Sequence, residues 1–252
     1  MKKFFIIIII FVGLMPLAFG EVFIQNDQQY IGDDNALHIV GEIINNLEVP
    51  LNQINVHVTL LDEDGNLIAI KETSSLVNTI MPGMKSPFDL VLTDNEVKKT
   101  KSYSFELDYK VSPPKNQAID ITESKLSRDN YNNLIITGTV TNRGDITANT
   151  VAVIVTLYDN EGNVAAVSRV HPEPDYLRAN DYVFFVVSIP DKIQTKGIND
   201  YTLIAESEEY AAVPEFPVGT FVLLVGTLFA YIGITKYSGR IIPNLIFVTN
   251  LK

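Results

Sequence analysis

The sequence predicts an all-β protein flanked by two apolar terminal segments, and three observations support this fold class. Apolar and polar side chains alternate along the central part of the chain, as Ile54, Val56, Val58 and Leu60 do between polar neighbours. Clusters of Asp, Asn and Gly interrupt such runs at short intervals, as turns require. No central stretch sustains a helical period of 3.6 residues over three turns.

Residues 1–20 have the features of a secretory signal peptide. Two lysines precede an apolar run over residues 4–12, and Ala18 and Gly20 place small residues where a signal peptidase cleaves. We therefore expect cleavage before Glu21. The alternative is an uncleaved anchor, although the run is shorter than the roughly 20 residues that span a bilayer.

The central part of the chain repeats itself at an offset of 97 residues. Leu37–Gly41 aligns with Leu134–Gly138, and Val58–Asn66 aligns without a gap with Val155–Asn163. Two copies of one domain are therefore expected, over residues 21–112 and 113–212, joined at a Ser-Pro-Pro-Lys segment.

Each copy is expected to consist of short strands. A hairpin is predicted where Asp62–Asn66 separates two apolar runs. The other expected strands are Leu37–Ile44, Phe88–Leu92 and Tyr103–Tyr109 in the first copy, and Leu134–Val140, Tyr182–Ile189 and Tyr201–Ala205 in the second. About seven strands in roughly 90 residues are typical of an immunoglobulin-like β-sandwich, so two tandem sandwiches are predicted.

A motif in each copy resembles the FxLYD domain, a small extracytoplasmic β-sandwich family. The residues that carry the resemblance are Gly41, Asn45, Leu60, Asp62 and Gly65 in the first copy, and Gly138, Asn142, Leu157, Tyr158, Asp159 and Gly162 in the second. Both copies depart from the family where Val58 and Val155 replace Phe, and the first copy lacks the Tyr. The resemblance implies a structural or binding module without a reaction.

The C-terminal segment is predicted to span a membrane. Residues 218–237 are apolar with a single charge, and a helix of that length crosses the ~30 Å hydrocarbon core. Lys236 and Arg240 follow the span, as on the cytoplasmic side, and residues 238–252 form a short cytoplasmic tail. The alternative, a buried helix of a soluble domain, is disfavoured because the segment has no polar face.

Residues 213–217 precede this segment and contain Pro214, Glu215 and Phe216. A Pro-Glu-Phe motif followed by an apolar span and a basic residue resembles the archaeal PEF/PEFG-CTERM sorting signals. The resemblance implies processing by a membrane-embedded, archaeosortase-like enzyme. Two departures are that Pro217 stands in place of the Gly and that twelve residues follow Arg240.

The composition restricts the classes of function. The chain has a formal net charge of -11 and no Cys, which excludes disulfides and thiolate chemistry and argues against nucleic-acid partners. All 30 acidic residues lie between Glu21 and Glu215, together with 14 of the 19 basic ones, so this region carries -16. Such a surface favours solubility and repels anions.

No catalytic, cofactor or metal site is predicted. The loop Asp62–Asn66 lacks the Gly and Glu that a calcium-binding EF-hand needs, so a hairpin turn is the expected structure. His38, His57 and His171 are too far apart in sequence to form a chelating motif. Four aromatic residues near one loop either pack in the core or dock a ligand or glycan, and core packing is favoured: Tyr176, Tyr182, Phe184 and Phe185.

These observations together predict a non-catalytic, single-pass cell-surface protein whose duplicated acidic ectodomain serves binding or envelope structure. The expected partners are the membrane, another surface protein or envelope component, and the processing enzyme. The first alternative is an accessory or sensor-like subunit of a membrane complex. The second is a surface carbohydrate-active enzyme, which would need two carboxylates flanking a cleft.

Overall fold

The computed structural model describes residues 20–95, 97–191, 194–198 and 200–212, together with Thr227 and Tyr231. The prediction of an all-β protein is confirmed, because these residues form β-sheets in which every strand pair but one is antiparallel, and the main exception to strand and loop is the short 3-10 helix η1 (Val97–Lys99). Within this described part, no helix is long and apolar enough to cross a membrane. The predicted signal segment and membrane span lie outside the described residues, apart from Gly20, Thr227 and Tyr231.

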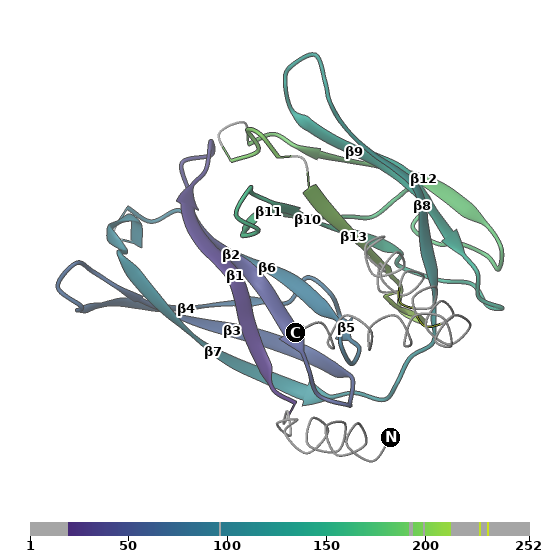
Figure 1. Ribbon diagram of the computed structural model, residues 1–252, viewed down its shortest axis with the longest axis horizontal. Coiled ribbons are helices and arrows are strands. Elements are labelled where there is room, and N and C mark those ends of the chain that lie inside the picture. The colour runs from purple at the N-terminus through teal and green to yellow at the C-terminus, as the bar shows by residue number, and fades with distance from the viewer. Residues whose placement is uncertain are drawn as a thin grey trace, which may run out of the picture. The chain divides into compact units, whose positions relative to one another are not determined.

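The N-terminal half contains two antiparallel sheets (Figure 1). The first has the order β1-β2-β6, and β3 lies between β4 and β7 in the second. The strands are β1 (Val22–Ile31), β2 (Leu37–Asn45), β3 (Leu51–Leu61), β4 (Leu67–Ser74), β5 (Thr79–Ile80), β6 (Lys85–Leu92) and β7 (Ser102–Val111). Ile39, Val56 and Phe88 from both sheets share one buried cluster, so the sheets pack face to face.

The C-terminal half repeats this arrangement. Its sheets have the orders β12-β9-β8-β14 and β11-β10-β13. The strands are β8 (Gln117–Arg128), β9 (Leu134–Asn142), β10 (Ala152–Tyr158), β11 (Val164–Val170), β12 (Tyr182–Ile189), β13 (Asp200–Glu206) and β14 (Ala211–Ala212). Ile136, Val155 and Phe185 share its buried core. The predicted span of β12 is correct, whereas β1 and β8 were not among the expected strands.

The offset of 97 residues extends to the backbone geometry. β2 and β9 coincide at this offset, as do β6 and β12. Residues with positive φ recur in pairs at the same offset: Asn26 and Glu123, Asn35 and Asn132, Gln53 and Thr150, Gly65 and Gly162, and Gly83 and Asn180. The first pair marks a bulge in the equivalent strands β1 and β8. The two halves therefore share local backbone conformation as well as strand order.

The two halves differ in how their central strands are buried. β3 alternates between buried and half-buried residues, as expected for a strand with one core face. Every residue of β10 is buried. Val153 and Val155 face the core of their own half, whereas Ile154 belongs to the buried cluster of the N-terminal half. The sheet containing β10 thus packs against the N-terminal half, and we call this contact the joint.

Candidate functional site

The two motif asparagines stabilise equivalent turns. Asn45 is fully buried and donates hydrogen bonds of 2.9 Å to the carbonyl oxygens of Val49 and Ile80, while its own oxygen accepts one from the Leu47 amide. Asn142 makes the same three contacts, with the carbonyl oxygens of Ile146 and Leu177 and with the amide of Gly144. A buried side chain with all its polar groups bonded fixes the end of its strand.

The two motif glycines make room for an aromatic ring. A Cβ atom on Gly138 would lie 2.7 Å from the ring of Phe185, and one on Gly41 would lie 2.9 Å from the ring of Phe88. Each ring therefore rests on bare backbone in the core. The glycines thus have a packing role.

The remaining motif residues also have structural roles. The carboxylate of Asp62 accepts hydrogen bonds from the amides of Asp64 and Asn66, and Asp159 does the same for the equivalent amides. Leu60 and Leu157 are fully buried. The hairpin predicted at Asp62–Asn66 is confirmed, since β3 and β4 pair across it and Gly65 has a φ of 81°.

Tyr158, the Tyr of the second motif, lies at the joint. Its hydroxyl donates a hydrogen bond of 2.5 Å to Glu42, a fully buried residue of β2, and accepts one of 2.6 Å from Lys85. Lys85 also forms an ion pair with Glu42 at 2.7 Å, and the side-chain amide of Asn26 donates a hydrogen bond to the other carboxylate oxygen of Glu42. Burial and the Glu42 carboxylate raise the pKa of Tyr158 well above its usual range, so the hydroxyl stays protonated.

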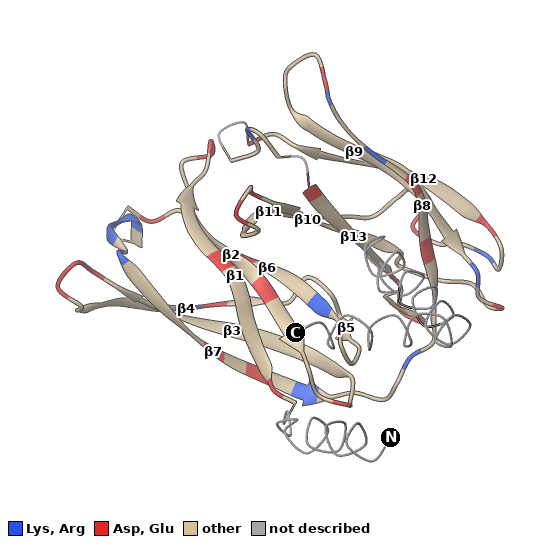
Figure 2. Ribbon diagram, in the orientation of Figure 1, with Lys and Arg blue, Asp and Glu red and all other residues tan. Residues whose placement is uncertain are grey.

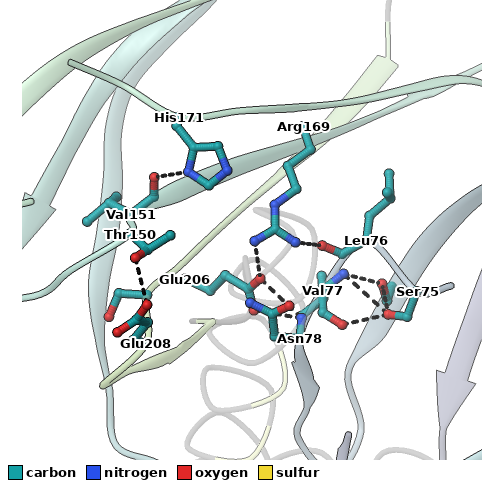
Figure 3. A network of polar contacts seen from close by, with 12 residues as sticks. Ser75, Leu76, Val77, Asn78, Thr150, Val151, Arg169, His171, Glu206 and Glu208 are labelled. Carbon is teal, nitrogen blue, oxygen red and sulfur yellow. Dashed lines mark hydrogen bonds and ion pairs between the residues drawn. The ribbon is translucent and has the colours of Figure 1, made fainter. Parts of the chain in front are cut away.

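A second polar cluster at the joint is centred on Glu206 of β13 (Figure 3). This carboxylate is 1% exposed, accepts hydrogen bonds of 2.9 and 3.1 Å from the Asn78 amide, and lies 3.3 Å from Arg169. Arg169 in turn donates a 2.7 Å hydrogen bond to the carbonyl of Leu76. Burial raises the pKa of Glu206 to about 7, against the opposing effects of Arg169 and the Asn78 amide.

An open polar groove of about 410 Å³ lies beside this cluster. Amide and hydroxyl side chains from β3 and the segment after β4 line it, together with Lys115 and Glu208 of the C-terminal half. Lys115 donates a 2.8 Å hydrogen bond to the carbonyl of Glu208, so its charge is partly engaged. The groove contains no pair of converging carboxylates, as a glycosidase would need.

The three histidines lie apart and each contacts groups of its own half. His38 lies between Asp34 and Asp89, with nitrogen to oxygen distances of 3.3 and 3.1 Å, and the bond to Asp89 raises its pKa. His57 lies 2.9 Å from Asp108, and His171 contacts the carbonyl of Val151. Among the described residues, no group of His, Asp and Glu side chains has the geometry of a metal site.

The aromatic cluster is largely exposed, contrary to the interpretation favoured by the sequence. Phe185 is buried, but Tyr182 and Phe184 are 65% and 69% exposed, and Tyr176 is 48% exposed. Val186 continues the row on β12 with 62% exposure. Core packing was the wrong interpretation for these three residues: Tyr182 and Phe184 occupy the alternate positions of β12 that point away from the core, and Tyr176 lies exposed in the loop before β12. We call Tyr182, Phe184 and Val186 the apolar row.

The predicted sorting motif at Pro214, Glu215 and Phe216 lies outside the described residues, as does residue 213 before it. Sequence reasoning did not identify Glu42, Lys85, Arg169 and Glu206 as a group. They come from separate strands of the two halves, so no local motif unites them.

Comparisons with known proteins identify no relative. No protein family profile and no curated protein matches the chain. The exo-chitosanase CsxA of Amycolatopsis orientalis is a similar solved structure, with a TM-score of 0.29 and 13% identity over 76% of this chain and 26% of that chain. Red sea bream transglutaminase has a TM-score of 0.24 and 8% identity over 76% and 29% of the two chains.

A tandem CBM22 domain of Paenibacillus barcinonensis Xyn10C has a TM-score of 0.15 and 12% identity, covering 75% of this chain and 84% of that chain. The chain thus spans about a quarter of the length of the first two proteins. TM-scores this low carry no argument about fold or function.

Proposed function

We propose that this protein is a non-catalytic, membrane-anchored cell-surface protein whose two immunoglobulin-like β-sandwich domains act as one binding or envelope-structural arm. The two-domain division at residues 112 and 113 and the FxLYD-type assignment are part of this proposal. The single observation that carries it is the joint, where β10 is buried on both faces. Because the joint fixes the two copies of the domain to each other, their exposed surfaces are held at a fixed spacing.

The contacts at the joint support a rigid arm rather than two independently moving domains. Apolar packing of Ile154 and Ile204 against the N-terminal half accompanies two buried polar clusters, at Glu42 and at Glu206. Separation of the halves would expose apolar surface and would remove the hydrogen bonds that Tyr158 donates to Glu42 and that the Asn78 amide donates to Glu206, which leaves buried polar groups without partners. The apolar row on β12 is the exposed surface best suited to contact a partner.

The proposal is tested on intact cells that produce the full-length protein. A membrane-impermeant amine label should modify Lys71 and Lys125 without cell lysis, and cross-linking with mass spectrometry should recover neighbours in the envelope. Recovery of peptides beyond Phe216 distinguishes a retained anchor from a processed one. Labelling that occurs only after lysis would contradict a surface location.

A further inference from the structure

Strand β12 (Tyr182–Ile189) combines an open hydrogen-bonding edge with the apolar row. It lies at the edge of its sheet, since the strand order is β12-β9-β8-β14. Figure 1 shows β12 beside β9. An exposed, apolar edge strand is a template for pairing with another strand, and native proteins close such edges with charges, proline or a covering segment.

The equivalent edge in the N-terminal half is closed. β6 is the counterpart of β12, and there Pro87 lacks an N–H while its carbonyl accepts a 3.0 Å hydrogen bond from the Leu76 amide. The hydroxyl of Thr73 bonds the carbonyl of Asp89 on the same edge at 2.8 Å. Proline and a covering segment are the usual devices that prevent pairing.

The same edge in the C-terminal half has none of these devices. Phe184 is the counterpart of Pro87, because Phe184 pairs with Thr139 of β9 as Pro87 pairs with Glu42 of β2. The carbonyl of Pro87 points away from β2 and toward Leu76. By the same register, the N–H and C=O of Phe184 point away from β9. Within the part of the chain that the structure describes, no hydrogen bond from the segment after β11 reaches Phe184. The backbone of Tyr182, Phe184 and Val186 therefore presents donors and acceptors at this edge.

The strand also carries no charge. The other edge strands longer than two residues, among those described, each contain charged residues, such as Asp27 in β1, Lys71 in β4 and Arg169 in β11. Figure 2 shows acidic and basic residues on strands of both halves, whereas β12 itself contains neither acid nor base. In a chain with a net charge of -11, a second copy would be repelled at most surfaces, but β12 brings no like charges together.

We propose that β12 pairs antiparallel with β12 of a second copy of this chain about a two-fold axis. In the register that satisfies the free backbone groups, Phe184 lies opposite Phe184 of the second copy, and Tyr182 lies opposite Val186. Residues directly opposite in an antiparallel pair point to the same face, so the two apolar rows become one continuous strip. The interface is isologous and closes at the dimer.

This pairing gives the binding role proposed above a specific partner and rests on that role. It is measured on purified protein, whereas the surface location is measured in cells, so either can fail without the other. The chain has no Cys, and a single introduced thiol therefore reports only its own neighbours.

The test uses the full-length protein in mild detergent with the substitution Phe184→Cys under mild oxidation. In the proposed register the two Cα atoms form a hydrogen-bonded pair about 5.5 Å apart, within the roughly 4.4–6.8 Å that a disulfide spans. Val91→Cys is the matched control. Val91 is 47% exposed and belongs to the same alternate set of positions on β6 as Phe184 does on β12, but the edge of β6 is closed. We expect a disulfide-linked dimer with Phe184→Cys and none with Val91→Cys.

A second variant tests the same pairing without relying on a disulfide. Phe184→Lys places like charges opposite each other, so the protein mass from light scattering should fall about twofold while the circular dichroism spectrum is unchanged. Val91→Lys should leave the mass unchanged. A monomeric wild-type protein, equal cross-linking of both Cys variants, or a β12 edge found paired with a strand of a different protein would each overturn the proposal.

Discussion

The hydroxyl of Tyr158 lies 2.5 Å from the carboxylate of Glu42, and this contact joins two strands from different halves of the chain. At the position 97 residues earlier, Leu61 is only half-buried at the outer face of β3. One position of the repeated motif therefore packs the joint in the C-terminal half and faces outward in the N-terminal half. A protonated hydroxyl is needed there, because it donates to Glu42 while accepting from Lys85.

Removal of this hydroxyl should destabilise the joint. Tyr158→Phe leaves the buried Glu42 with one hydrogen bond fewer, and we expect the free energy of unfolding to fall by about 1–3 kcal/mol in urea titrations. Tyr131→Phe is the control, because Tyr131 is 77% exposed and should change stability by less than about 0.5 kcal/mol. Equal stability of the two variants would mean that the Tyr158 hydroxyl contributes nothing to the joint.

Glu206 should make stability depend on pH. Its folded-state pKa of about 7 exceeds the ordinary value of 4.5, so the folded protein binds this proton more tightly than the unfolded chain. The contribution of this group to stability therefore falls as pH rises from about 4.5 to about 7, and the difference corresponds to about 3 kcal/mol. It is constant below and above that window.

The measurement is the free energy of unfolding at several pH values for the wild type and Glu206→Gln. The difference between the two curves isolates this carboxylate from the other titrating groups, and the slope between pH 4.5 and 7 should be lost in the variant. Glu161→Gln removes a charge from an exposed turn and should keep the wild-type slope. Parallel curves for wild type and Glu206→Gln would refute the assignment.

The sequence allowed prediction of the elements that repeat but not of the joint. Alternation and turn residues predicted the strands, because each half buries one face of each sheet in its own core. Burial of Glu42 was not predictable, since a carboxylate in a strand normally faces water and its partners lie on β1, β6 and β10. A signal for the joint did exist, because β10 has Ile154 where β3 has His57.

The buried asparagines should be intolerant of the isosteric acid. Asn45→Asp replaces the amide that donates to the carbonyls of Val49 and Ile80 with a group that only accepts when ionised. We expect a loss of at least about 2 kcal/mol in the free energy of unfolding, because the buried carbonyls then face a negative charge. Asn46→Asp adds the same charge at the exposed neighbouring residue and should have little effect.

The close approach of Gly138 to Phe185 predicts a coupled pair of substitutions. Gly138→Ala places a methyl group 2.7 Å from two ring atoms, so the ring must shift within a packed core, which costs about 1–3 kcal/mol. Phe185→Leu replaces the ring with a smaller side chain, which creates a cavity and destabilises the protein when the change is made alone. The same change removes the clash with the new methyl group.

The double variant should therefore be more stable than the sum of the two single losses implies, by more than about 0.5 kcal/mol in urea titrations. The same cycle on Gly41 and Phe88 tests whether the repeat conserves the energetics as well as the geometry. Since the Gly41 contact is 2.9 Å, its alanine variant should be the less destabilised of the two. Strict additivity in both halves would contradict the predicted clash, because the cost of each alanine would then not depend on the ring.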